Sequence, residues 1–370
     1  MPEPLVAARP LVRGLVGDKA GAWDLAGELP ADLLTDLGAR GLLCAQVGTE
    51  YGGLGASSLA NGEFTAFVGG LCSSLRSVMT SQGMAAWTIQ RLGDAGQRAE
   101  HLRHLVSGGL AAVAFSEPDA GSDLAAMAAT ITPDGDDVVV TGRKVWTTAA
   151  AYADRIVVFG RYGDGAAAVV VPVSRPGVRV TRVADPLGCR AAGHANVELT
   201  DVRVPAGQVL GGTGQSLPLL VTAALAYGRM SVAWGCVGIL RSCVAAVGAH
   251  ARERRQFGTA LIEHQLVARH MAELYADERS ATLACAHASR CWDEGSPDMV
   301  AATVLAKYTG SRHAARGAAT AVQVLASAGA RDGHAVARAY RDAKLMEIIE
   351  GSSEICQLML SRHALAADYS

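Results

Sequence analysis

The sequence of 370 residues has few aromatic side chains: 5% of residues are Phe, Trp or Tyr, whereas 50% are hydrophobic. A core must therefore be built mainly from Ala, Val and Leu. Because Ala has the highest helix propensity, this composition favours closely packed helices. The same hydrophobic content excludes an intrinsically disordered chain, which could not bury enough apolar surface to fold.

The sequence also has no excess of one charge and no long uninterrupted apolar run. The 33 Lys and Arg residues balance 35 Asp and Glu residues, so we expect no nucleic-acid or anionic-membrane surface. The most apolar stretch, residues 217–246, is interrupted by Pro218, Arg229 and Arg241, which predicts a buried helix and no membrane span. The N-terminus lacks the apolar segment of a secretory signal.

The eight cysteines are scattered, with no C-x-x-C pair and no Cys/His cluster at metal-ligand spacing. This pattern predicts no metal site. Reduced thiols fit a cytoplasmic protein best, because disulfides persist mainly in oxidising compartments.

Periodicity divides the chain into three parts, in line with the two or three domains expected from its length. Residues 1–110 and 213–370 space apolar residues at three and four, which is typical of helices. Residues 111–212 instead contain short β-rich runs separated by Gly, Pro and Asp turns. We therefore predict an α+β protein with a small antiparallel sheet or barrel between two helical domains.

Two candidate motifs lie in the β-rich part. Phe115–Asp123 carries an apolar run into a Ser/Pro/Gly/Asp turn, whose small hydroxyls and free N–H groups could hold a phosphate or a ring edge. Trp146 with Thr147 and Thr148 could pack on a flat cofactor while a threonine hydroxyl bonds its ring nitrogens. Taken alone, an ordinary turn and a core Trp are the commoner explanations.

Two further motifs lie in the C-terminal part. Arg254, followed by Phe257 and Gln265, could bind a pyrophosphate, although a solvated basic face is the simpler interpretation. Glu350 follows two isoleucines and precedes a Gly-Ser-Ser break. A helix C-terminus and apolar neighbours both raise a carboxyl pKa toward the range of a general base. The alternative is that Glu350 belongs to a solvated acidic stripe.

In their order along the chain, these motifs resemble the acyl-CoA dehydrogenase family over nearly the whole sequence. Ser116 stands where the family usually has Thr. The motifs are Glu50-Tyr51-Gly52-Gly53-Leu54-Gly55, Ser116-Glu117-Pro118 with Ala120-Gly121-Ser122-Asp123, Gly142-Arg143-Lys144-Val145-Trp146-Thr147-Thr148, Arg254-Arg255-Gln256-Phe257-Gly258 with Gln265, Arg341-Asp342-Ala343-Lys344, and Glu350-Gly351-Ser352-Ser353-Glu354.

The resemblance implies an N-terminal helical domain, a middle antiparallel β domain and a C-terminal four-helix bundle, with FAD between the β domain and the bundle. The residues expected to bind FAD within one subunit are Phe115, Ser116, Ser122, Trp146 and Thr148, with Ser352 and Glu354 closing over it. Those expected to reach the FAD of a partner subunit, in a homodimer or homotetramer, are Arg254, Phe257, Gln265 and Gln323. Substrate contacts are expected from Ser122, Arg229 and Gly351.

In the same resemblance, Glu350 matches the base that takes the α-proton of an acyl thioester while a hydride leaves for the flavin. The Glu350 backbone N–H and a ribityl hydroxyl would polarise the thioester carbonyl. Some members of the family place the base directly before the residue that here is Arg229. That position is Gly228, so Glu350 has no competitor.

Two departures from the family pattern are informative: the first bears on the binding of CoA esters, and the second on the geometry around the ADP part of FAD. The Asp expected near the pantetheine is Ala226, and the Gly-Gly expected after Gln323 is Ala326-Ser327. The chain most resembles the dehydrogenase-like enzymes of methoxymalonyl-ACP formation in polyketide antibiotic biosynthesis. We therefore predict a small thioester on an acyl carrier protein, with an electron-acceptor protein or another oxidant as partner. The alternatives are an acyl-CoA dehydrogenase for ordinary CoA esters, a flavin oxidase or monooxygenase, and a flavin-binding protein without turnover.

Overall fold

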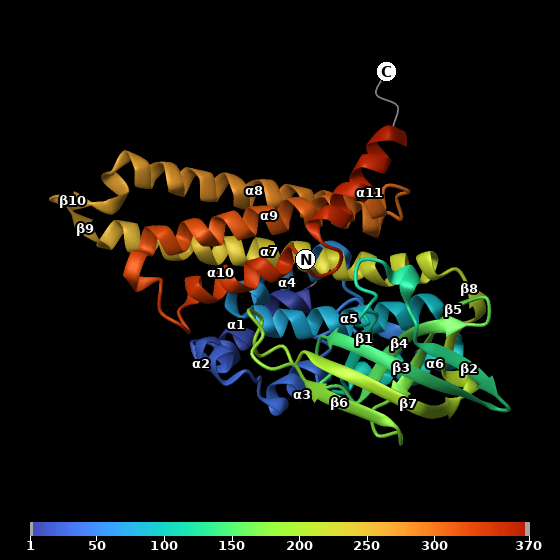
Figure 1. Ribbon diagram of the computed structural model, residues 1–370. Coiled ribbons are helices and arrows are strands. Elements are labelled where there is room, and N and C mark those ends of the chain that lie inside the picture. Colours follow the sequence, from blue (N-terminus) through green and yellow to red (C-terminus); the bar gives the residue numbers. More distant parts are fainter. Residues whose placement is uncertain (1–2, 367–370) are drawn as a thin grey trace.

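The computed structural model describes residues 3–366, and Figure 1 shows one large β sheet at the lower right, with helices from both ends of the sequence beside and above it. The α+β class predicted from the sequence is thereby confirmed. The helices of the N-terminal part are α1 (Glu3–Val16), α2 (Lys19–Ala26), α3 (Ala31–Ala39), η1 (Thr49–Tyr51), α4 (Ser58–Leu71), α5 (Ser73–Leu92) and α6 (Ala95–Val106).

Local hydrogen bonds set where these helices begin and end. The periodicity of residues 59–75 suggests one helix, but Cys72 is extended, with φ −154°, and separates α4 from α5. The Cys72 thiol accepts from the Leu75 N–H and so caps α5. At the start of α6, the side chains of Asp94 and Gln97 each accept from the other's backbone N–H at 2.8 Å. This capping box satisfies two N–H groups that the helix leaves unpaired.

The sheet is mostly antiparallel, in the order β6-β7-β3-β2-β4-β5-β8. It differs from the expected antiparallel sheet because β1 and β2 both pair with β4 in parallel. β1 leads directly into the Phe115 motif, and β3 ends at Thr147 within the Trp146 motif. The strands are β1 (Ala111–Ala114), β2 (Thr130–Asp134), β3 (Asp137–Thr147), β4 (Arg155–Tyr162), β5 (Gly165–Pro172), β6 (Val178–Arg182), β7 (Ala195–Pro205) and β8 (Val209–Gln215), with η2 (Leu124–Ala126) and η3 (Ala206–Gln208) between them.

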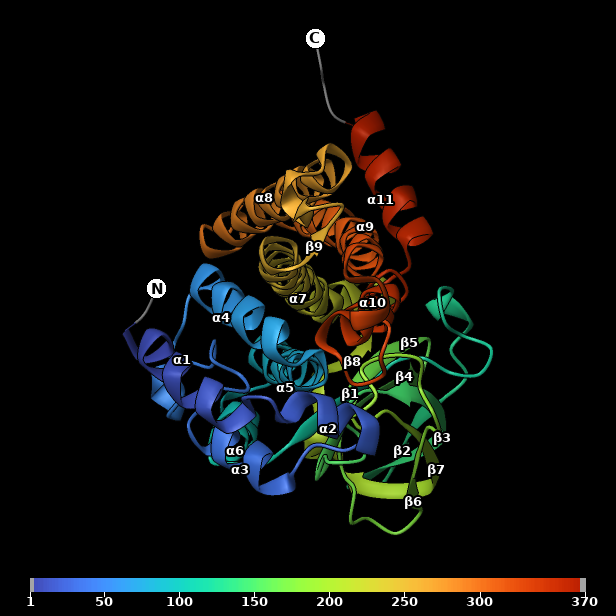
Figure 2. The ribbon, with the colours of Figure 1, turned by 90° about the vertical axis from the view of Figure 1, so that its left-hand side faces the viewer.

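The C-terminal helices pack around α7, which Figure 2 shows between α4 and α5 on one side and α8, α9 and α10 on the other. Among the described residues, only α7 is long and apolar enough to cross a bilayer. Of its most apolar window, 67% is buried inside the protein, as in the core helix of a soluble protein. The elements are α7 (Leu217–Glu253), β9 (Arg255–Gln256), β10 (Thr259–Ala260), η4 (Leu261–Glu263), α8 (Gln265–Asp293), α9 (Met299–Leu325), η5 (Ala326–Ala328), α10 (Ala335–Met346) and α11 (Ser353–Ala366).

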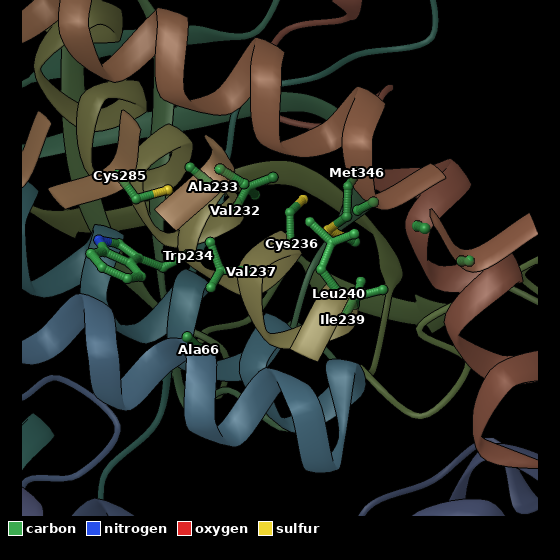
Figure 3. Packing of buried hydrophobic residues seen from close by; sticks show 14 of the residues in the cluster. Ala66, Val232, Ala233, Trp234, Cys236, Val237, Ile239, Leu240, Cys285 and Met346 are labelled. Atoms are coloured by element: carbon green, nitrogen blue, oxygen red, sulfur yellow. The ribbon is translucent and has the colours of Figure 1, made fainter. Parts of the chain in front are cut away.

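Small residues let α4 and α7 approach each other closely, as the Ala-rich and aromatic-poor composition predicts. A Cβ at Gly238 of α7 would lie 2.2 Å from the carbonyl oxygen of Ala66 in α4. A Cβ at Gly62 of α4 would lie 2.0 Å from the indole nitrogen of Trp234. Figure 3 shows this core, in which α7 side chains lie between Ala66, Cys285 of α8 and Met346 at the end of α10. The packing fixes α7 relative to the helices that carry the candidate site.

Candidate active site

Glu350 lies in the short connection between α10 and α11. Its φ is +56°, and Gly351 follows with φ +92°. Only glycine adopts such a left-handed conformation without a steric penalty. For a glutamate the strain amounts to about 1–3 kcal/mol, and it persists only where the surrounding structure holds it.

Two buried cations hold this connection by its carbonyl oxygens. Arg229 of α7 donates from Nε to the carbonyl oxygen of Glu350 at 3.1 Å. Lys307 of α9 donates from Nζ to the carbonyl oxygen of Gly351 at 2.6 Å. Lys307 is 0% exposed and Arg229 is 4% exposed. Because hydrogen bonds from charged donors are stronger than neutral ones, these contacts offset the backbone strain at Glu350.

The Glu350 carboxylate is enclosed, although the residue as a whole is half-buried. Its Oε2 is buried and has no hydrogen-bond partner among the described residues. Burial raises the pKa of Glu350 to about 7, against the opposing effect of the positive charges on Arg229, Lys307 and Arg76. The raised pKa expected from the sequence is therefore present, and the solvated acidic stripe is not, since only Glu354 is exposed to water in that way. An unpaired carboxylate with this pKa suits a general base.

Gly228 provides the space that the carboxylate occupies. A Cβ at position 228 would lie 2.1 Å from Oε2 of Glu350 and 2.8 Å from Sδ of Met84. A larger residue at position 228 and the observed position of the Glu350 carboxylate therefore exclude each other. A side chain at position 228 would therefore displace the Glu350 carboxylate.

A buried ion pair joins the two motifs of the β domain. Nζ of Lys144 lies 2.7 Å from Oε1 of Glu117 and donates to the carbonyl oxygen of Phe115 at 3.1 Å. Burial disfavours the ionised carboxylate, but hydrogen bonds from Lys144 and from the amides of Ala128 and Ala129 outweigh it. The pKa of Glu117 consequently lies below its usual value. The ion pair fixes the turn after β1 against β3.

This arrangement presents Trp146 at the surface. The N–H of Val145 donates to the carbonyl oxygen of Ser116 at 2.9 Å, so the two motifs lie side by side. Trp146 has φ +54° and its side chain is 53% exposed. Thr148 is half-buried, and its Oγ1 lies 3.2 Å from Nδ1 of His194.

The residues of the first motif differ in exposure. Phe115 and Ser116 are half-buried. The Phe115 ring stacks on Phe159 with 4.2 Å between the ring centroids, so its packing partner is the core of the β domain. Ser122 is exposed in the following turn, where Asp123 caps η2 by accepting from the Ala125 N–H.

The residues of the Phe115–Asp123 motif and of the Trp146 motif fit an FAD. The exposed indole of Trp146 is a flat apolar surface beside hydroxyl groups. Two buried polar atoms of the motifs, Oγ1 of Thr147 and Oε2 of Glu350, have no hydrogen-bond partner among the described residues. Buried polar atoms nearly always have partners, so a bound cofactor or substrate that pairs with them fits the site. Within residues 3–366, no group of three His, Cys, Asp or Glu side chains is placed to hold a metal ion.

A second group of expected cofactor residues lies at what we call the bundle tip, defined as Arg254, Phe257, Gln265 and Gln323. All four are exposed, and Phe257 is 95% exposed with φ +51°. They lie where α7 ends, α8 begins and α9 ends, beside the β9–β10 hairpin. Figure 1 shows this hairpin at the end of the bundle that points away from the β sheet. One chain therefore does not bring the bundle tip to Trp146.

The remaining expected residues surround the base. Arg229 donates to the carbonyl oxygen of Glu350, and Gly351 follows Glu350 directly in the chain. Ser352 is half-buried and directly precedes α11, and its hydroxyl accepts from the Ile355 N–H. Glu354, the second residue of α11, is exposed. At the end of α9, close in sequence to Gln323, Ala326 has a conformation that suits glycine, with φ +49° and ψ −132°.

Sequence reasoning missed several residues of the site: Lys307, Arg76, His194 and Met84. Lys307 and Arg76 share a signal, since each is a lone cation within a run of small or apolar residues on a helix. Arg76 is 1% exposed and donates to the Thr80 hydroxyl at 3.1 Å. His194 has no such signal, because it lies in an irregular segment before β7.

Comparisons with known proteins match these features over almost the entire chain. Family models described as the N-terminal, middle and C-terminal domains of acyl-CoA dehydrogenase match residues 6–109, 112–202 and 219–365. The probable acyl-CoA dehydrogenase YngJ of Bacillus subtilis (strain 168) is 32% identical over 350 residues, which cover 92% of each chain. Glutaryl-CoA dehydrogenase of Desulfococcus multivorans is 30% identical, over 95% of this chain and 93% of that protein.

A solved structure is more similar in sequence. It is that of FkbI, described as serving biosynthesis of the methoxymalonyl extender unit of the polyketide immunosuppressant Fk520. FkbI is 65% identical to this chain, with a TM-score of 0.94 over 97% of this chain and 99% of FkbI.

Proposed function

Because the chain belongs to the acyl-CoA dehydrogenase family, and is thus an FAD-dependent dehydrogenase of acyl thioesters, we propose that Glu350 is its catalytic base. The observation that carries the proposal is the enclosed, unpaired Oε2, with a pKa raised to about 7. Near neutral pH such a carboxylate is ionised often enough to accept a proton and basic enough to hold it.

In this proposal Oε2 of Glu350 takes the proton from the carbon next to the thioester carbonyl. The Glu350 N–H donates to no backbone carbonyl in the described part of the chain, and it polarises the thioester carbonyl, which acidifies that carbon. Arg229 and Lys307 keep this N–H and the carboxylate in place through their bonds to the neighbouring carbonyls. FAD, when bound, accepts the hydride that leaves the adjacent carbon.

We assign the cofactor contacts as the resemblance implies. Phe115, Ser116, Ser122, Trp146 and Thr148 bind FAD from the same subunit, and Ser352 and Glu354 close over it. The bundle tip reaches the FAD of a partner subunit, in a homodimer or homotetramer. Its exposure supports this assignment, because an aromatic ring as exposed as Phe257 is better accommodated at an interface. Ser122, Arg229 and Gly351 contact the substrate.

We further propose that the acyl group is small and polar and hangs from an acyl carrier protein, as in methoxymalonyl extender-unit formation. The 65% identity to FkbI supports this assignment, as does Ala226 at the position where the family has an Asp near the pantetheine. A carrier protein presents its own pantetheine, so the enzyme needs fewer groups for nucleotide recognition. The contact between the two proteins is then of the small, transient type.

An electron acceptor and a cellular location complete the proposal. The electrons leave the reduced flavin for an electron-transfer protein or another oxidant. The protein is cytoplasmic, because all eight of its cysteines are buried as free thiols, which suits a reducing compartment.

The test is to compare kcat/KM for one acyl group attached to acyl carrier protein, to CoA and to free pantetheine, by anaerobic flavin reduction. We expect the carrier-protein thioester to be the best substrate. Equal or faster turnover of the CoA ester would overturn the carrier-protein assignment and leave an ordinary acyl-CoA dehydrogenase. Rapid reoxidation of the flavin by air would instead indicate an oxidase.

A further inference from the structure

The hydrogen bond between Thr148 and His194 is held rigidly from both sides. Oγ1 of Thr148 lies 3.2 Å from Nδ1 of His194. The carbonyl oxygen of Thr148 accepts from the hydroxyl of Ser81 at 2.9 Å, and that of His194 accepts from the Val183 N–H at 2.9 Å. Because both backbones are fixed, the threonine hydroxyl and the imidazole stay within reach of each other.

The imidazole of His194 is neutral. Its side chain is buried, with 8% of the residue exposed. Burial and the nearby Arg76 guanidinium lower the pKa of His194 to about 4. Arg76 forms no ion pair with a carboxylate among residues 3–366, so its positive charge is not compensated there. A neutral imidazole has one nitrogen that donates and one that accepts.

The surroundings of the ring favour one tautomer. Nε2 is buried and has no hydrogen-bond partner among the described residues. A buried donor without a partner is rarer in proteins than an incompletely satisfied acceptor. The hydrogen therefore belongs on Nδ1, from where it is donated to Oγ1 of Thr148. This leaves the hydrogen of the Thr148 hydroxyl free for another acceptor.

We propose that His194 is a positioning residue that directs the Thr148 hydroxyl hydrogen toward a ring nitrogen of oxidised flavin. The proposal rests on the proposed function, in which Thr148 contacts the flavin. A nitrogen that accepts this hydrogen bond in the oxidised ring carries a hydrogen itself after reduction and accepts no longer. The hydrogen bond therefore stabilises the oxidised form, lowers the midpoint potential and favours passage of electrons to the acceptor.

The experiment measures the midpoint potential and FAD content of the purified holoenzyme. His194→Phe fills similar space without a hydrogen-bonding group, and we expect it to favour the reduced flavin about tenfold, which is about +30 mV for a two-electron couple. His194→Asn places an amide N–H near the position of Nδ1 and should restore the wild-type potential. His363→Asn, at an exposed site on α11, is the control and should have no effect.

A second background tests whether His194 acts through Thr148. In Thr148→Val, the His194→Phe change should shift the potential no further, because there is no hydroxyl to orient. A His194→Phe holoenzyme with the wild-type potential would overturn the proposal, as would an equal shift in both backgrounds. If His194→Phe fails to fold, a wild-type potential in Thr148→Val overturns it as well. Failure of wild-type protein to bind FAD or to be reduced by any thioester would contradict the proposed function instead.

Discussion

The surroundings of Glu350 and the bundle tip differ in how far a single chain completes them. Around Glu350, cations from α7 and α9 bind the backbone, Gly228 makes room for the carboxylate, and water is kept from Oε2. At the bundle tip, the side chains of Arg254, Phe257 and Gln265 extend into solvent. The two regions nevertheless belong to motifs of one family and are expected to serve one kind of cofactor site.

Under the proposed function, this difference means that folding and assembly build separate halves of the site. The base is positioned when the bundle packs, because Arg229 and Lys307 lie on its central helices. Under the proposed function, the bundle tip contacts a cofactor only when another copy of the chain approaches it. Substitutions around Glu350 should therefore change rate and stability within one subunit, whereas those at the tip should change cofactor occupancy and association.

The largest effect is expected from Glu350→Gln. The amide has nearly the same shape but accepts no proton at neutral pH, so flavin reduction by substrate should slow by about 10²–10⁴-fold. FAD content and fold should not change. Glu347→Gln is the matched control, because that side chain lies three residues earlier and pairs with Lys344 at 3.0 Å. Stopped-flow flavin reduction under anaerobic conditions measures the rate, and a Glu350→Gln rate within tenfold of wild type would show that another group is the base.

A second prediction concerns stability and pH. The folded pKa of Glu350 is about 7, above the ordinary value of 4.5. Its contribution to stability is therefore complete below about pH 4.5 and is lost as the pH rises through 7. Gln does not titrate, so Glu350→Gln should be the more stable protein at pH 8, by about 2–3 kcal/mol. At pH 5, still just above the unfolded pKa, this advantage should fall to about 1 kcal/mol or less.

Urea unfolding of both holoproteins at pH 5 and pH 8 measures this difference. The same titration should make flavin reduction by wild-type enzyme faster as the pH rises through about 7. A stability difference that is equal at the two pH values would mean that Glu350 is ionised at both, and hence that its carboxylate is solvated.

The sequence predicts that Glu350 is unusual, but it does not predict which side chains surround it. Apolar neighbours and a glycine break are local features, and they suffice to predict a raised pKa for Glu350. Lys307 and Arg76 come from helices far away in the sequence, so no local pattern places them beside the 350 segment. The parallel pairing of β1 with β4 cannot be predicted for the same reason, because hydrophobic periodicity identifies a strand but not the strand with which it pairs.

A third prediction tests the space over Gly228. Gly228→Ala would place a Cβ 2.1 Å from Oε2 of Glu350, so the carboxylate must move away from its position. We expect flavin reduction to slow by about tenfold, which is the loss of about 1.4 kcal/mol of transition-state stabilisation. Overpacking should also reduce the free energy of unfolding by about 1–3 kcal/mol.

Gly248→Ala is the matched control on the same helix, because the nearest atoms to its added Cβ are 3.7 Å away. It should retain the wild-type rate and gain stability from the higher helix propensity of Ala. If Gly228→Ala were as active as Gly248→Ala, the carboxylate would not occupy the position that the structure gives it.

The smallest effect on folding is expected at the bundle tip. Arg254 is exposed, so Arg254→Ala should change the free energy of unfolding of the subunit by no more than about 0.5 kcal/mol. Its effect should fall on the flavin-to-protein ratio, which decreases, and on light scattering, which shows dissociation at higher protein concentration than for wild type. This follows because a ligand held between subunits links its own binding to their association.

Arg175→Ala, at an exposed position in the turn between β5 and β6, should change neither quantity. An Arg254→Ala protein with full flavin occupancy and unchanged size would show that one chain completes the FAD site, and the contrast with Glu350 would then be one of exposure alone.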